Sequence, residues 1–225
     1  MADDQIKKKD GTILTGQVTK VEGGQVFISS RGGRDIIPYN LNDIQSVEMA
    51  PPADMEKVKD AAPATVVATL EPLVKQYTGL PAVWMIEAMT QLAEAYAATG
   101  KQDQAGAMYN QIEQLYPGSP YLVLVVAGKA KLALLNGKVE EAITALKPLI
   151  DQANQNVAPS PTEGSLYAQA FLVYGQALEA QKKFPEALEA YLTVKTIFYQ
   201  KSDLAEQADQ FAAKLRQQNP GLSIE

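Results

Sequence analysis

The sequence predicts an α+β protein in which a small N-terminal all-β barrel is followed by an all-α solenoid of antiparallel helix hairpins. Residues 1–50 alternate between apolar and polar side chains, and glycine pairs interrupt the alternation, as in short strands joined by tight turns. Further along, helix-forming residues dominate, and small residues recur at matched offsets. Pro51 and Pro52 separate the two parts, because paired prolines disfavour both helix and strand pairing. We therefore expect a barrel at 1–50, a linker at 51–62 and a helical solenoid at 63–225.

The N-terminal part is expected to form five short strands. They are predicted at residues 5–9, 12–21, 25–30, 34–38 and 44–49, with tight turns at the Asp-Gly and Gly-Gly pairs, including Gly32-Gly33, and a one-turn 3₁₀ connector at 40–43. The interior is expected to hold seven apolar residues: Ile13, Val18, Val26, Ile28, Ile36, Ile44 and Val47. So small a core on five twisted strands favours a closed barrel.

A glycine spacing in this part resembles a known family of small barrels. Gly11 and Gly16 enclose four residues, as in the first motif of the Sm family, so an SH3 or Sm-like barrel is expected. The resemblance does not extend to that family's RNA pocket, since Glu22 and Val26 stand near the places where it needs an aspartate and an asparagine. Acidic residues also flank the lysine run at 7–9. Nucleic-acid binding is therefore not expected.

The helical part is expected to begin with a helix over 63–77, because Pro63 suits a first helical turn and Thr78-Gly79 suits an end. Further helices are predicted near 82–98, 102–115, 120–135, 139–153, 164–181, 185–199 and 203–218. Pro148 should bend the helix that contains it near Thr144. A polar loop is expected at 154–162. The last helix has one apolar face and serves as a terminal cap.

Large and small residues alternate in this part as two interlocking helices require. Leu92 and Tyr96 are large, Ala93 and Ala105 are small, and Gly100 permits the turn between the helices. With Tyr109 and Pro117, this spacing resembles the tetratricopeptide repeat (TPR), a helix pair of about 34 residues. Matched positions, such as Gly137 for Gly100, Gly175 for Ala93 and Ala187 for Ala105, extend the resemblance to three repeats at 86–119, 123–156 and 168–201. The alternative is an ordinary helical bundle.

The composition limits the chemistry of the chain. The formal net charge of −6 is mild, and there is no histidine and no cysteine, so the commonest general base, the commonest metal ligand and all thiol chemistry are missing. We expect no enzymatic activity, no cofactor and no metal site.

No apolar run is long enough to cross a bilayer. The lack of cysteine suits an exported protein of the bacterial periplasm whose signal peptide has been removed, and a cytoplasmic location is the alternative. With its Lys9-Asp10-Gly11 start, the barrel ahead of the TPRs resembles that of some bacterial envelope proteins, so a protein of that type is expected.

The TPR resemblance implies a concave groove formed by the first helix of each repeat, and hence a protein or peptide partner. The implied groove residues are Glu87, Thr90, Glu94, Leu124, Ala127, Lys131, Leu135, Gln169, Leu172, Gln176 and Glu179. They lack the basic clamp that holds acidic peptide ends, so a neutral or basic, partly apolar segment is the expected ligand. Alternatively, Leu124, Leu135 and Leu172 pack between helices. The expected function is a non-enzymatic scaffold, with a self-assembling structural protein as the alternative and a nucleic-acid adaptor as the least favoured one.

Overall fold

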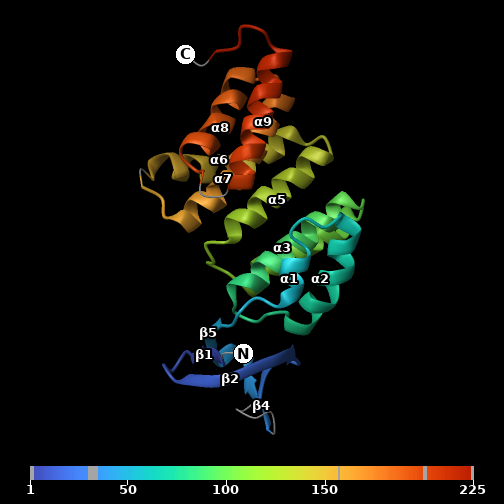
Figure 1. The fold of residues 1–225 in the computed structure, drawn as a ribbon, viewed down its shortest axis with the longest axis vertical. Coiled ribbons are helices and arrows are strands. Elements are labelled where there is room, and N and C mark those ends of the chain that lie inside the picture. The colour runs from blue at the N-terminus through green and yellow to red at the C-terminus, as the bar shows by residue number, and fades with distance from the viewer. Residues whose placement is uncertain (1–2, 30–34, 157, 200–201, 224–225) are drawn as a thin grey trace. The chain divides into compact units, whose positions relative to one another are not determined.

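The computed structural model describes residues 3–29, 35–156, 158–199 and 202–223. In these residues an antiparallel sheet precedes a series of α-helices, as the α+β prediction requires (Figure 1). The chain divides into two compact units, Met1–Pro117 and Gly118–Glu225. The first unit thus contains the sheet and the first helices together. The sequence predicts a barrel that ends at residue 50 and a solenoid that begins at residue 63. That these two parts are independent domains stays a prediction.

The five predicted strands are present in the first unit. They are β1 (Asp4–Lys8), β2 (Ile13–Glu22), β3 (Gln25–Ser29), β4 (Ile36–Asn40) and β5 (Ile44–Glu48), and the predicted connector is the 3₁₀ helix η1 (Leu41–Asp43). The strand order is β4-β3-β2-β1-β5, with antiparallel pairing throughout. The turn expected at Gly32-Gly33 and the strand start expected at Arg34 lie outside the described residues.

Strand β2 changes partner at Gly16. Asp4 of β1 pairs with Gly16, and the next residue, Gln17, pairs with Ser29 of β3. A Cβ atom on Gly16 would lie 2.5 Å from the Ser29 carbonyl oxygen and 2.8 Å from a methyl carbon of Ile28. Gly16 therefore permits the backbone approach that lets one long strand pair with two partners.

The expected closure of the sheet into a barrel is not observed, because β4 and β5 are the two edges and do not pair with each other. Each edge is protected in another way. On β5, the Val47 N–H donates to the carbonyl oxygen of Pro81 at 2.9 Å. On β4, the bond from Leu41 N–H to Gly24 O sets the ladder alternation so that Pro38 turns its nitrogen away from β3. A proline there removes an exposed donor and discourages further strand pairing.

For two of the seven residues that were expected in the core of the sheet, the prediction is wrong. Ile13 is 62% exposed and Ile36 is 58% exposed. Ile13 lies five residues before Val18 on one strand, so the two side chains point to opposite faces, and Val18 occupies the buried one. Ile36 lies on the edge strand β4. The other five expected residues are buried, and the fully buried Ile6 was not predicted.

The helices of the first unit are α1 (Ala53–Lys57), α2 (Pro63–Tyr77), α3 (Val83–Ala98) and α4 (Gln102–Leu115). The short α1 falls in the expected linker and was not predicted, whereas the other three agree closely with the sequence. Helix α2 lies against the sheet, where the Gln76 side-chain amide donates to the Thr19 carbonyl oxygen at 2.8 Å. The sheet and the first helices are therefore joined by direct contacts.

The second unit contains α5 (Leu122–Leu135), α6 (Val139–Gln155), α7 (Pro161–Ala180), α8 (Phe184–Thr196) and α9 (Ser202–Gln218). Each helix packs against the next one, and α5 also packs against α7 (Figure 1). Pro148 lies inside α6, which continues to Gln155, so the loop before α7 is shorter than expected. A Ser160–Glu163 capping box starts α7. Contacts limited to near neighbours are typical of stacked repeats.

The three predicted hairpins have the same turn geometry. The backbone N–H groups of Lys101, Lys138 and Lys183 each donate to a carbonyl oxygen five residues earlier, at 2.8–2.9 Å. This bond closes a Schellman motif, whose preceding residue adopts a positive φ. Gly100 and Gly137 supply that residue in the first two hairpins, and Lys182 supplies it in the third with φ 62°. The third hairpin therefore ends its first helix in the same way as the other two, although it has a lysine in place of the glycine.

The small residues that were expected to sit at helix crossings are buried. Ala93, Ala105 and Ala187 are fully inaccessible to solvent, and Gly175 is buried as well. A Cβ atom on Gly175 would lie 2.4 Å from a ring carbon of Tyr191 on α8. Helices α7 and α8 therefore approach each other through a notch that only glycine leaves open.

Candidate functional site

The eleven groove residues implied by the TPR resemblance lie on α3, α5 and α7. Three of them belong to the first unit. Glu87 and Glu94 are half-buried, whereas Thr90 is buried and its hydroxyl donates to the Ile86 carbonyl oxygen at 2.8 Å. Glu94 lies close enough to Tyr109 to help raise the pKa of that phenol, after the larger effect of burial. Thr90 therefore contributes to helix packing and does not offer its hydroxyl to a ligand.

The remaining groove residues belong to the second unit and differ in exposure. Ala127 and Leu172 are buried and pack in the core of the unit. Leu135 is 57% exposed and Lys131 is also exposed, so both lie on the surface of α5. The half-buried residues are Leu124, Gln169, Gln176 and Glu179. The leucines were expected either to line the groove or to pack between helices. Leu172 packs between helices, whereas Leu135 faces solvent.

Helices α5 and α7 place these side chains in two stripes. Leu124, Lys131 and Leu135 recur at spacings that keep them on one side of α5, and Gln169 and Gln176 do so on α7. The two helices are in contact. Glu179, at the end of the second stripe, accepts a hydrogen bond from the Tyr191 hydroxyl at 3.0 Å and so ties α7 to α8. Among the stripe residues, Lys131 and Leu135 are exposed and Gln176 is half-buried, so these three are accessible to a ligand.

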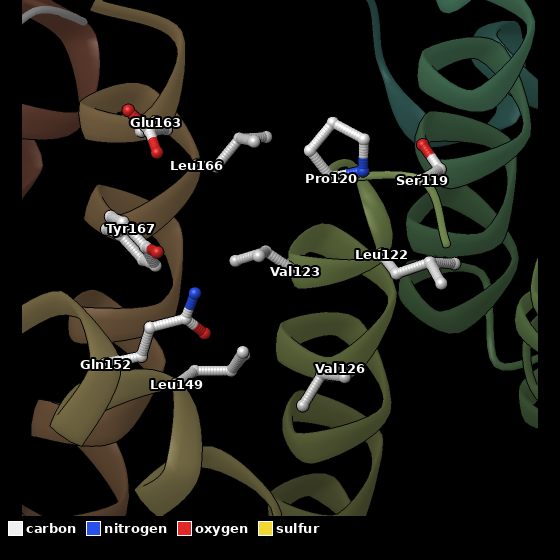
Figure 2. Close-up of a pocket in the computed structure, with 10 residues that line it drawn as sticks. All are labelled: Ser119, Pro120, Leu122, Val123, Val126, Leu149, Gln152, Glu163, Leu166 and Tyr167. Carbon is white, nitrogen blue, oxygen red and sulfur yellow. The ribbon is translucent and has the colours of Figure 1, made fainter. Parts of the chain in front are cut away.

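A cavity of about 310 Å³ opens near the starts of α5 and α7. Its apolar lining comes from three helices of the second unit: Leu122, Val123 and Val126 of α5, Leu149 of α6 and Leu166 of α7. In Figure 2, Val123 and Val126 point from α5 across the gap towards the side of α6 and α7. None of the eleven groove residues lines this cavity.

The polar groups at the cavity are Ser119, Gln152, Glu163 and the hydroxyl of Tyr167. Glu163 accepts hydrogen bonds from the Ser160 hydroxyl at 2.7 Å and the Ser160 N–H at 2.9 Å, which lower the pKa of its carboxyl and keep it ionised at neutral pH. Burial, with a smaller effect of Glu163, raises the pKa of Tyr167, which stays neutral. Neither Gln152 nor the Tyr167 hydroxyl makes a hydrogen bond with another described residue. The cavity thus combines apolar walls, one negative charge and three neutral hydrogen-bonding groups, of which Gln152 and Tyr167 have no hydrogen-bond partner among the described residues.

The described residues contain no group of three acidic side chains placed to hold a metal ion. Within the same residues, every helix is too short or too polar to cross a lipid bilayer.

Family models of the tetratricopeptide repeat match two stretches of the chain, residues 87–119 and residues 128–197. The first stretch contains most of α3 and all of α4, and it nearly coincides with the first predicted repeat. The second stretch runs from within α5 to the end of α8 and covers most of the other two. Tetratricopeptide repeats are therefore present in both units. A search of curated proteins found no match.

The sequence did not predict the cavity. Val123, Leu149 and Leu166 belong to three helices, and each fits a helix core by its spacing alone. Only the three-dimensional packing shows that they leave a space between them. The one local signal nearby was the capping box formed by Ser160 and Glu163, which fixes the first turn of α7.

Proposed function

We propose that this protein is a non-enzymatic scaffold that binds a polypeptide partner through the stripes on α5 and α7. The observation that carries the proposal is the direct contact of these two helices, which are the first helices of successive repeats. Such helices form the concave side of a repeat stack and present side chains to a ligand. The lack of histidine and cysteine in the sequence supports a binding role over catalysis.

The chemistry of the stripes favours a neutral or basic, partly apolar segment. Leu135 offers exposed apolar surface, Gln176 offers an amide, and Glu179 adds negative charge at one end. Lys131 is a single exposed cation and does not form the paired basic clamp that an acidic peptide terminus requires. A partner with apolar anchors and few acidic residues fits these groups best.

A matched pair of double variants tests the proposal. Leu135→Lys with Gln176→Lys adds two positive charges to the stripes and removes an exposed apolar group. Thr144→Lys with Ala145→Lys adds the same charge to exposed positions of α6. Partner recovered from native extract on the immobilised full chain should fall at least tenfold for the first variant and stay unchanged for the second. Equal recovery on both variants, with both folds intact by circular dichroism, would reject the stripes as the binding surface.

Self-assembly is a second candidate, and exposed isoleucines of the sheet favour it. Ile13, Ile36 and Ile37 are 62%, 58% and 45% exposed. Exposed apolar side chains of a sheet can be covered by a second copy of the same chain. Light scattering over a concentration series should show a rising mass for the wild type and a constant mass for Ile36→Lys with Ile37→Lys. A constant monomer mass for both proteins would remove this candidate.

We also propose that the protein acts outside the cytoplasm, in the bacterial periplasm. A sequence without cysteine has no thiol to oxidise in that compartment. Fractionation of native cells tests this location, and recovery of the protein with cytoplasmic markers would refute it.

A further inference from the structure

The cavity near the starts of α5 and α7 is separate from the stripes and offers a different kind of contact. We propose that it receives one large apolar side chain of an extended partner segment, whose backbone is bound by Gln152 and Tyr167. The proposal rests on the proposed scaffold function and specifies part of the partner's chemistry.

The size and the walls of the cavity indicate what fits inside it. Its volume of about 310 Å³ lies at the lower limit of ligand pockets, which suits a single anchoring group better than a whole cofactor. Val123, Val126, Leu149 and Leu166 form walls without a charged group. Burial of a leucine or phenylalanine side chain against such walls is favourable in proportion to the apolar area removed from water.

The polar groups indicate the conformation of the segment. Figure 2 shows the Gln152 amide and the Tyr167 hydroxyl directed towards the same space as Val123. Neither group hydrogen-bonds to another described residue. A helical partner has already satisfied its own backbone groups, whereas an extended segment brings free N–H and C=O groups that an amide and a hydroxyl can bind. The extended segment is therefore the better occupant.

Charge complementarity excludes an acidic occupant. Glu163 is the one charged side chain among the described residues that line the cavity, and its hydrogen bonds to Ser160 keep it ionised. An acidic anchor or a free C-terminal carboxylate would enter against this charge, because no cation lines the space. The occupant that fits this charge is therefore a neutral anchor residue with neutral or basic neighbours.

The probe is a set of acetylated and amidated heptapeptides of serine and threonine, with leucine, phenylalanine, alanine or glutamate at the centre. Each peptide is titrated against the full chain and followed by chemical-shift changes. The leucine or phenylalanine peptide should bind at least tenfold more tightly than the alanine and glutamate peptides. An alanine peptide that binds as tightly as the leucine peptide would overturn the proposal.

Variants then place the binding in the cavity. Val126→Phe fills the space and should abolish the preference for the large apolar residue, and Val123→Thr, which keeps the side-chain shape, should weaken it severalfold. Gln152→Ala with Tyr167→Phe removes both backbone contacts and should weaken binding about tenfold. Gln155→Ala changes an exposed residue on α6, the helix that carries Gln152, and should have no effect. Unchanged affinity in Val126→Phe and in the Gln152 and Tyr167 variant would refute the site.

The outcome distinguishes this proposal from the scaffold function. If the peptides show no preference while native partner is still lost on Leu135→Lys with Gln176→Lys, only the cavity proposal fails. If native partner capture is insensitive to the stripe variants, the proposed function fails by its own test.

Discussion

The close crossing of α7 and α8 predicts that Gly175→Ala destabilises the second unit although alanine favours helices. The added Cβ atom would lie 2.4 Å from one ring carbon of Tyr191 and 2.8 Å from another, against an ordinary contact of about 3.5–4.0 Å. Tyr191 is fully buried, its hydroxyl donates to Glu179, and its ring packs on Phe211 with centroids 5.4 Å apart. The ring must therefore move by about 1 Å and disturb contacts with α7 and α9.

The expected magnitude follows from two opposing effects. Overpacking of a tight core costs up to about 3 kcal/mol, and replacing glycine by alanine inside a helix returns about 1 kcal/mol. The net loss should be about 2 kcal/mol of unfolding free energy, measured by denaturant unfolding of the full chain. Gly106→Ala is the matched control, since Gly106 also lies in a helix and its added Cβ would meet nothing within 4 Å. This control should gain about 0.5–1 kcal/mol.

A double-mutant cycle separates the steric effect from other causes. In a Tyr191→Leu background the ring is gone, so Gly175→Ala should no longer destabilise and should approach the gain of the control. A Gly175→Ala protein as stable as the wild type would refute the reasoning, as would an undiminished loss in the Tyr191→Leu background.

Three further predictions concern single features. Lys182→Gly should stabilise the chain by about 0.5–1 kcal/mol, because it relieves a left-handed residue at the position that glycine occupies in the other hairpins; no change in the unfolding midpoint would contradict this. Gly16→Ala should destabilise the sheet by about 2 kcal/mol or more, since its Cβ would collide with backbone at Ser29; amide exchange of β2 and β3 should rise, and unaltered protection would disprove it. Burial raises the pKa of Tyr109, Tyr116 and Tyr191, so the folded state keeps protons that the unfolded state loses. Their contribution is fully present below the unfolded pKa of about 10 and declines above it, so a flat stability profile from pH 9 to 12 would exclude this linkage.

The repeat architecture could be predicted because local rules determine it. Gly100 and Gly137 provide the left-handed residue that a helix end requires, and Ala105 and Ala187 leave the space that a neighbouring helix fills. These requirements apply within a few residues, so the sequence displays them directly. Most helix limits follow from the same signals.

Features that depend on packing between residues far apart in the sequence could not be predicted from local patterns. The alternating pattern of the sheet did not reveal that Ile13 would face solvent or that β4 and β5 would remain unpaired edges. Thr90 and Leu172 belong to the same set of expected groove residues as the exposed Lys131 and Leu135, and both are nevertheless buried, because neighbouring helices cover them. A periodic pattern identifies the face of a helix, and the depth of each residue on that face depends on the whole fold.

Site-specific photo-crosslinking can show whether the α5 and α7 stripes touch a polypeptide partner, as we propose. A photoreactive residue would replace Leu135 or Gln176 in one pair of proteins and exposed Thr144 on α6 in a control. Native extract should yield a covalent partner adduct from positions 135 and 176 and little from 144. An adduct that forms equally well from position 144, or one that forms there alone, would contradict the account.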